Sequence, residues 1–146
     1  MQSDLRTLLD KKGHAVHTVT PETTALAAVR AMNENRIGAV LVVEHDVPVG
    51  IFTERDVLRR VVESEREPKD VPVGELMSSP LVTVEPRMSV MDAMRLMTDR
   101  RLRHLPVMEG TRLVGMVSIG DLTKWVTSDL RDEVEQLETY ITGPQL

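Results

Sequence analysis

One segment of this chain occurs twice. Residues 18–61 align without a gap on residues 83–126, at an offset of 65, and more than a quarter of the aligned positions are identical, Asp56 with Asp121 among them. An internal repeat of this kind predicts two copies of one supersecondary unit. Each copy alone, at about 65 residues, is marginal as an independent core. We therefore expect the copies to share a core and to form related clefts.

Each copy carries the same succession of hydrophobic patterns. An apolar, β-branched run at 39–43 predicts a buried strand, and apolar residues at helical spacing over 24–33 predict a helix before it. A hairpin partner strand and a second helix follow. The fold class is thus α/β (α+β), with two β-α-β-β-α repeats packed about a pseudo-two-fold axis. The expected strands are 16–19, 39–43, 49–52, 105–108 and 113–117, and the expected helices are 24–33, 56–62, 90–99 and 122–126.

Polar composition and turn residues divide the chain. The stretch 63–72 is polar and contains two prolines, which is typical of a linker. Before the first copy, Ser3-Asp4 and Gly13 predict the start and the end of a short helix. The expected parts are an N-terminal helix at 1–13, repeat 1 at 14–62, the linker, repeat 2 at 73–127, and a C-terminal amphipathic helix with its tail at 128–146.

The repeats do not need the C-terminal helix for their own core. Ser128 is a suitable N-cap residue, and Gly143-Pro144 is a typical helix stop. Along this helix the apolar residues form one narrow stripe. The stripe consists of Leu130, Val134, Leu137 and Ile141. It docks either on a second subunit or on the module's own surface, and the sequence favours neither.

Composition argues against several classes of function. A net charge of −5 and only three aromatic residues disfavour a nucleic-acid surface. No apolar run is long enough for a membrane span, and no signal peptide is recognised. There is no cysteine for disulfides or thiol chemistry, and His14 and His17 lack a third metal ligand nearby. We expect a cytoplasmic protein that needs no metal and contacts neither membrane nor nucleic acid.

The sharpest shared motif joins the last strand of each copy to its last helix. It reads Gly, two apolar residues, a hydroxyl residue, two variable residues and Asp, at 50–56 and at 115–121. A helix N-terminus offers backbone N–H groups and a positive dipole end to an anion, beside the hydroxyl. An Asp one turn later can accept hydrogen bonds from the vicinal hydroxyls of a sugar. The hydroxyl and carboxylate positions are Thr53 and Asp56, and Ser118 and Asp121.

The same spacing has a simpler interpretation. Thr-x-x-Asp and Ser-x-x-Asp are also capping boxes, which only satisfy backbone donors at a helix start. One isolated copy favours that interpretation. Two copies at equivalent positions, each preceded by the same glycine, favour a phosphate-and-ribose site for a nucleotide.

At this point the residues resemble a known family. The repeat resembles the CBS domain, and the pair, over residues 14–127, resembles a Bateman module of the small stand-alone kind. Besides the two motifs, three segments carry the resemblance. They are Arg36-Ile37-Gly38-Ala39-Val40, Arg103-His104-Leu105-Pro106-Val107 and Val73-Gly74-Glu75-Leu76-Met77.

The resemblance implies a regulatory, non-enzymatic sensor. Such modules bind adenine nucleotides in two clefts and signal the ligand state to a partner through a conformational change. AMP is the first candidate ligand, with ADP, ATP, NAD or S-adenosylmethionine as alternatives. The family commonly assembles from two modules, so the resemblance also implies a homodimer and an unidentified regulated partner.

The resemblance also assigns site residues. Asp56 and Asp121 match the ribose-binding Asp, and Thr53 and Ser118 match the phosphate-contacting hydroxyl. The expected base contacts are Thr18, Val19, Ile37, Gly38 and Ala39 in site one, and Thr83, Val84, His104, Leu105 and Pro106 in site two. Arg55, Arg103 and His104 are expected near the phosphates. Leu41 replaces Pro106 and Arg55 replaces Gly120 between the copies, so either the sites differ in ligand or only one is occupied.

Two other functions are weighed against the sensor. An interaction or scaffold module without nucleotide binding would have degenerate motifs, and both motifs here are intact. A small enzyme would need a nucleophile–base pair or a metal constellation, and the sequence contains neither.

Overall fold

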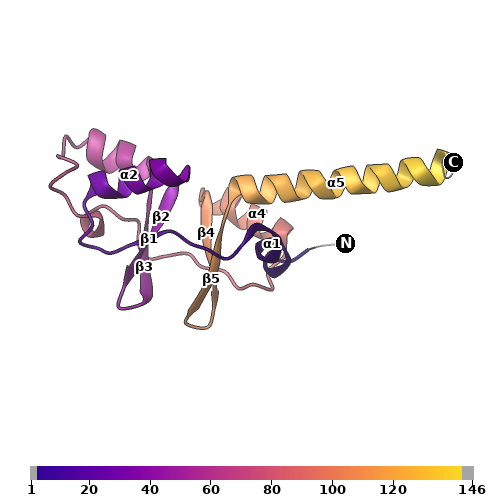
Figure 1. Cartoon of the computed structure of the whole chain (residues 1–146), viewed down its shortest axis with the longest axis horizontal. Coiled ribbons are helices and arrows are strands. Elements are labelled where there is room, and N and C mark those ends of the chain that lie inside the picture. Colours follow the sequence, from indigo (N-terminus) through magenta and orange to yellow (C-terminus); the bar gives the residue numbers. More distant parts are fainter. Residues whose placement is uncertain (1–2, 143–146) are drawn as a thin grey trace. The chain divides into compact units, whose positions relative to one another are not determined.

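The computed structural model describes residues 3–142, and Figure 1 shows the path of the chain. The first repeat has the order strand-helix-strand-strand-helix, and the second has helix-strand-strand-helix with a single bridge at Val84 in place of the first strand. This mixed order confirms the predicted fold class. The helices are α1 (Leu5–Lys12), α2 (Ala25–Asn35), α3 (Glu54–Asp56), the π-helix η1 (Val57–Val62), the 3₁₀ helix η2 (Val73–Glu75), α4 (Val90–Arg100) and α5 (Ile119–Thr142). The strands are β1 (Thr18–Val19), β2 (Ala39–Glu44), β3 (Val47–Thr53), β4 (His104–Glu109) and β5 (Arg112–Ser118).

The chain divides into two compact units that do not coincide with the two repeats. The first-repeat unit contains residues 15–83 together with 110–113. The second-repeat unit contains the residues up to 14, residues 84–109 and the residues from 114 onward. The first-repeat unit therefore includes the linker and the first residues of repeat 2, and the second-repeat unit includes the segment before repeat 1.

A three-stranded sheet in the order β1-β2-β3 forms the centre of the first-repeat unit. Strand β1 runs parallel to β2, with Thr18 opposite Leu41. Strands β2 and β3 are antiparallel and are joined by a tight turn in which His45 and Asp46 both have positive φ, as a two-residue hairpin turn requires. The hydrophobic core of the first-repeat unit consists of Ala25, Ala28, Met32, Val40, Val42, Phe52, Val61, Val71, Val73 and Leu76.

The predicted linker is only partly a linker. Residues 63–67 are exposed, but Val71 is buried, and its carbonyl accepts a 2.8 Å hydrogen bond from Ala25 N. The prediction placed residues 73–77 at the start of repeat 2. In the structure Val73 and Leu76, although part of repeat 2 by sequence, are buried in the core of the first-repeat unit. A sequence repeat thus marks homology between segments, whereas apolar burial decides with which core a segment packs.

The second-repeat unit contains the two-stranded sheet of β4 and β5, and Val84 adds a parallel bridge to Val107. Helix α1 belongs here: its three leucines are buried, and Asp4 caps it by accepting a hydrogen bond from Thr7 N at 2.9 Å. Gly13 ends this helix with a φ of 110°, so both predicted ends of α1 are confirmed.

Helix α5 differs from the prediction. It runs for 24 residues without a break, so the prediction of a new helix capped by Ser128 was wrong. No glycine or proline lies between residues 121 and 142 to end the helix, and cap residues alone do not end one. The predicted stop at Gly143-Pro144 lies outside the described residues. Among the described helices, none combines the length and the apolar composition that crossing a bilayer requires.

Candidate functional site

In the first-repeat unit the motif forms a reciprocal capping box. Thr53 N donates to Asp56 Oδ2 at 2.9 Å, and Asp56 N donates to Thr53 Oγ1 at 3.3 Å. Strand β3 ends at Thr53 and α3 begins at the next residue, so the box fixes the direction in which the chain leaves the sheet.

The second carboxylate oxygen of Asp56 is also engaged. Ser78 Oγ donates to Asp56 Oδ1 at 3.0 Å, and Arg60 Nε lies 3.8 Å from the same oxygen. Asp56 is the one buried charged residue in the described part of the chain, with 6% of its surface exposed. Its oxygens therefore serve the fold, and a sugar hydroxyl that reached Oδ1 would have to share that oxygen with Ser78. Sequence reasoning missed Ser78, because nothing in the local pattern links it to a residue 22 positions earlier.

In the second-repeat unit the same box has a different neighbour. Ser118 N donates to Asp121 Oδ2 at 2.8 Å, and Asp121 N donates to Ser118 Oγ at 3.1 Å. The ammonium of Lys12, at the end of α1, donates to the same Oδ2 at 2.5 Å and to the carbonyl of Met116 at 2.8 Å. Within residues 3–142 no donor reaches Asp121 Oδ1, and the side chain is 24% exposed.

The environment of Asp121 keeps it ionised. Burial alone would raise the pKa of Asp121, but the Lys12 ammonium and the Ser118 N–H outweigh burial and hold that pKa below its ordinary value. The second unit thus presents an ionised carboxylate with one available oxygen, which is the state that accepts hydrogen bonds from hydroxyl groups.

The helix N-termini offer less to an anion than the sequence predicts. The first N–H of α3, on Glu54, donates to Gly38 O at 3.0 Å, and the first N–H of α5, on Ile119, donates to Arg103 O at 2.8 Å. The third N–H of each helix is held by the motif hydroxyl. The expectation of free donors was therefore wrong for these groups. After Asp56 the helix also changes to the π form, so the long α5 provides the more regular dipole.

The motif glycines are explained by packing. A Cβ on Gly50 would lie 2.4 Å from Met77 Sδ, and a Cβ on Gly115 would lie 2.9 Å from Leu9 Cδ2. Met77 belongs to the first residues of repeat 2, and Leu9 belongs to helix α1, before repeat 1. The shared glycine therefore lets those segments pack closely against the last strand of each unit.

The other predicted residues of site one lie beside the motif. Ala39 is directly opposite Thr53 in the β2–β3 register, and Gly38 is tied to Glu54 by the hydrogen bond described above. Strand β1, with Thr18 and Val19, pairs with the middle of β2. Gly38, Ala39, Thr53 and Asp56 thus lie together at one end of the sheet, whereas Ile37 packs against the hydrophobic core of this unit. The side chain of Ala39 is fully buried and belongs to the core.

Main-chain hydrogen bonds position several of the predicted site-two residues. Val84 N donates to Pro106 O at 3.1 Å, while the carbonyl of Arg103 fixes the first turn of α5. The side chain of Leu105 is fully buried, so it contributes to the core and presents no surface to a ligand. Thr83 is the last residue that belongs to the first-repeat unit. The remaining predicted residues of this unit are Val84, Arg103, His104, Leu105, Pro106, Ser118, Gly120 and Asp121.

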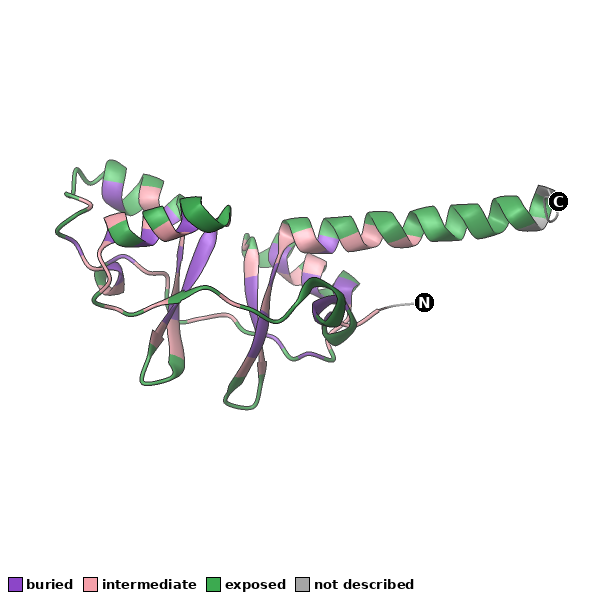
Figure 2. Ribbon diagram, in the orientation of Figure 1, coloured by how far each residue is buried: buried purple, intermediate pink, exposed green. Residues whose placement is uncertain are grey.

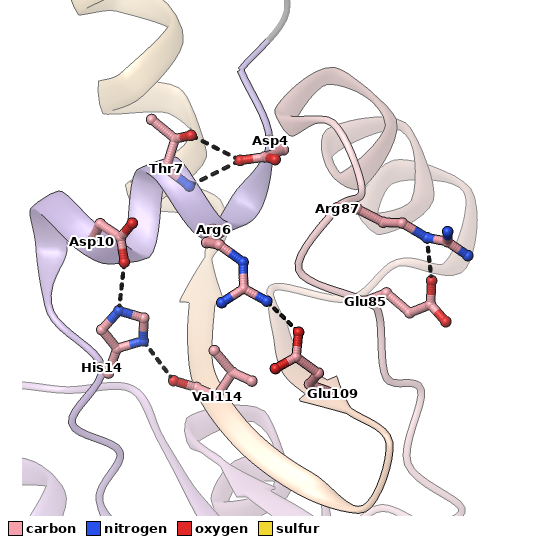
Figure 3. A network of polar contacts seen from close by, with 9 residues as sticks. All are labelled: Asp4, Arg6, Thr7, Asp10, His14, Glu85, Arg87, Glu109 and Val114. Atoms are coloured by element: carbon pink, nitrogen blue, oxygen red, sulfur yellow. Dashed lines mark hydrogen bonds and ion pairs between the residues drawn. The ribbon is translucent and has the colours of Figure 1, made fainter.

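His14 is a structural tether. Its ring nitrogens lie 2.9 Å from Asp10 Oδ1 and 2.9 Å from the carbonyl of Val114, as Figure 3 shows. These bonds hold the chain after α1 to strand β5. In the described part of the chain, no three potential metal ligands cluster together.

A comparison with protein families matches the CBS domain twice, at residues 13–63 and 73–128. The chain belongs to the CBS-domain family. Its members are commonly regulatory proteins, and both motifs described above fall inside the matched regions. The predicted resemblance is therefore confirmed.

Relatives and solved structures agree. The chain is 41% identical over 129 residues to the mitochondrial CBS domain-containing protein CBSX3 of Arabidopsis thaliana, a match that covers 85% of this chain and 63% of that protein. A solved structure of a CBS-domain protein from Burkholderia ambifaria superimposes with a TM-score of 0.84 and 42% identity, covering 87% of this chain and 96% of the other. A hexameric CBS-CP12 protein from bloom-forming cyanobacteria matches with a TM-score of 0.75 and 30% identity, covering 84% and 67%.

Proposed function

We propose that this CBS pair is a non-enzymatic sensor of adenine nucleotides that signals its ligand state to a partner through a conformational change. One observation carries the proposal: Asp121 is ionised, a quarter exposed, and has one oxygen without a donor from the described residues. Two vicinal ribose hydroxyls supply the donors that such a carboxylate accepts. A ligand shifts the module only by its differential affinity for the two conformations.

The ligand class in this proposal comes from the family resemblance, and the groups around that carboxylate would hold its parts. AMP is the first candidate, with ADP, ATP and NAD as alternatives, and no metal is required. The base would lie against the strand ends at Val84 and Pro106, and the phosphates near Arg103 and His104. In site one the corresponding cation is Arg55.

The two sites are unequal in this proposal. Asp56 already uses both oxygens inside the protein, whereas Asp121 shares one oxygen with Lys12 and keeps the other. We therefore assign the ribose to Asp121 first. The assembly proposed is a homodimer that reports to a regulated partner protein in the cytoplasm.

A thermal-shift panel on nucleotide-stripped protein tests the ligand class. AMP, ADP, ATP, NAD, S-adenosylmethionine and GTP are each compared with buffer. A ligand at 100 times its dissociation constant stabilises the protein by about 2.7 kcal/mol, which for a chain of this size raises Tm by roughly 5–10 °C. Shifts confined to the adenine ligands support the sensor, and no shift with any ligand overturns it.

Calorimetric titration then tests the residue. Asp121→Ala should weaken adenine-nucleotide binding by about 1.5–3 kcal/mol, the usual contribution of a hydrogen bond to a charged group. Thr139→Ala, on the exposed part of α5, is the matched control and should bind with unchanged affinity. An Asp121→Ala protein that folds and binds normally would refute the ribose assignment.

One observation favours the scaffold alternative. Both motifs form complete capping boxes. The helix start alone therefore explains why the same residue types recur in both copies, and no ligand is needed for that explanation. The thermal-shift panel separates the two functions, because a scaffold module would not respond to any nucleotide.

A further inference from the structure

The distal part of α5 carries an unpartnered apolar stripe. Near the start of α5, Leu122 is fully buried. Beyond residue 129 the apolar stripe is exposed to solvent, and Figure 2 shows this part of the helix as almost entirely exposed. Half of the large hydrophobic side chains that are exposed in the described chain lie on this stripe. They are Leu130, Val134, Leu137 and Ile141, exposed by 57%, 51%, 59% and 79%.

The spacing and the residue types fit a pair of helices. The intervals of four, three and four residues place Val134 and Ile141 at heptad position a, and Leu130 and Leu137 at position d. A stripe confined to a and d is the narrow seam of a coiled coil. In parallel coiled coils, β-branched residues at a with leucine at d favour two strands over three or four, so this rule concerns the number of helices and the charges beside the stripe must decide their orientation.

The charges beside the stripe determine its occupant. Residues 129–142 contain five acidic residues and one arginine, which disfavours docking on an anionic membrane surface. Positions e are Arg131 and Glu138, and one position g is Glu133. A parallel pair would place Glu133 of one helix beside Glu138 of the other. An antiparallel pair instead places Arg131 beside Glu138 of the second copy, twice by symmetry.

We propose that α5 pairs antiparallel with α5 of a second copy of this chain through this stripe. In that register Leu130 faces Ile141 of the second copy, and Val134 faces Leu137. Every layer then combines one β-branched residue with one leucine, so the layers are similar in volume along the seam. The proposed function includes a homodimer but names no surface for it, and this inference, which rests on that dimer, supplies one.

Cysteine cross-linking tests the register directly, because the chain has no native cysteine. Proteins carrying Leu130→Cys and Ile141→Cys are prepared separately, mixed and oxidised. Antiparallel pairing predicts disulfide-linked heterodimers. It also predicts little cross-linking of Leu130→Cys with itself, since those residues would lie about 16 Å apart along the helix axis. Thr139→Cys, on the opposite face of the helix, is the control and should not cross-link.

Charge reversal gives a second readout that does not depend on oxidation. Arg131→Glu should weaken the dimer at least tenfold in sedimentation or light scattering, and Arg131→Glu with Glu138→Arg should restore it. Self-linking of Leu130→Cys would overturn the antiparallel arrangement. A dimer that forms no cross-link in the mixture would overturn the surface while leaving the proposed homodimer intact, and nucleotide binding is scored separately in both cases.

Discussion

Each unit binds a segment from outside its own repeat, and the two units use different contacts to do so. In the first-repeat unit, Ile51 N donates to Ser78 O and Ser78 N donates to Ile51 O, at 3.1 and 2.8 Å. In the second-repeat unit, the residue equivalent to Ile51 is Met116, and its carbonyl accepts from the Lys12 ammonium instead. One unit therefore uses main-chain hydrogen bonds where the other uses charged side chains. At this position we therefore expect the contact in the second unit to depend on pH, and the main-chain contact in the first unit not to.

The same contrast extends to the motif carboxylates. Asp56 is buried and is completed by a neutral hydroxyl, whereas Asp121 is partly exposed and is completed by a cation. The two repeats thus share the capping box but differ in the further group that donates to the carboxylate, which is Ser78 in one unit and Lys12 in the other. We infer that Asp56 is mainly structural and that Asp121 is the residue with capacity left for a ligand.

The largest expected difference is between the variants that remove the carboxylates of Asp56 and Asp121, because only Asp56 is expected to be mainly structural. Asp56→Ala leaves Thr53 N and Ser78 Oγ without partners in a buried place, and we expect it to lower the free energy of unfolding by about 2–3 kcal/mol. Asp121→Ala loses a cap and a partly exposed ion pair, and should cost about 1 kcal/mol. Urea unfolding of both variants measures the difference. Equal losses would mean that burial does not distinguish the two boxes.

The close approach at Gly50 provides the next test. Gly50→Ala places a Cβ against Met77, and such overpacking typically costs about 1–3 kcal/mol. Met77→Ala in the same chain should recover part of that loss, which a double-mutant cycle measures as a coupling free energy. Strictly additive effects would show that the packing of Met77 does not require a glycine at position 50.

The sequence predicted the repeat, the element order and the capping boxes because each is a local pattern. Hydrophobic spacing defined α2 and the strands, and the Thr53–Asp56 and Ser118–Asp121 spacing defined the helix starts. The exchange of segments between units was not predictable, because Val73 and Leu76 read as apolar residues that any nearby core would accept. Which core they join depends on tertiary packing, not on local periodicity.

The partners of the motif carboxylates were missed for a related reason. Lys12 and Asp121 are 109 positions apart, and Ser78 and Asp56 are 22 apart. Neither partner lies in a motif, and an exposed lysine at a helix end is ordinarily explained by the helix dipole. Only the fold shows that the Lys12 ammonium reaches the carboxylate of Asp121.

Lys12→Met isolates the charged contact in the second unit. We expect a loss of about 0.5–1 kcal/mol near neutral pH, since both side chains are partly exposed and solvent screens the pair. The folded-state pKa of Asp121 is lowered, so its contribution is present above about pH 4 and is lost as the pH falls through that folded-state pKa. The difference in unfolding free energy between wild type and Lys12→Met should therefore shrink in acid. A difference that persists in acid, at a pH where NMR titration shows Asp121 to be protonated, would mean that the methylene chain of Lys12, and not its charge, stabilises the unit.

The smallest expected effect on stability concerns His14. In the first unit the segment at Ser78 is held by main-chain hydrogen bonds to Ile51, and no titrating side chain of the described residues takes the place of His14 in that contact. The hydrogen bonds of His14 to Asp10 and to the Val114 carbonyl raise the pKa of its ring, against smaller opposing contributions from partial burial and Arg6. Its stabilising contribution is therefore complete below about pH 6.5 and is lost as the pH rises through the folded-state pKa. Asp10→Asn should lower the pKa of His14, as NMR titration would show, and should reduce the pH dependence of unfolding above neutrality. Because the segment at Ser78 is held by main-chain bonds, amide exchange at Ile51 should stay constant over the same range, whereas protection at Val114 and Met116 should fall. If amide protection at Ile51 fell together with that at Val114 and Met116, the contacts in the two units would not be independent. The contrast between the units would then be wrong.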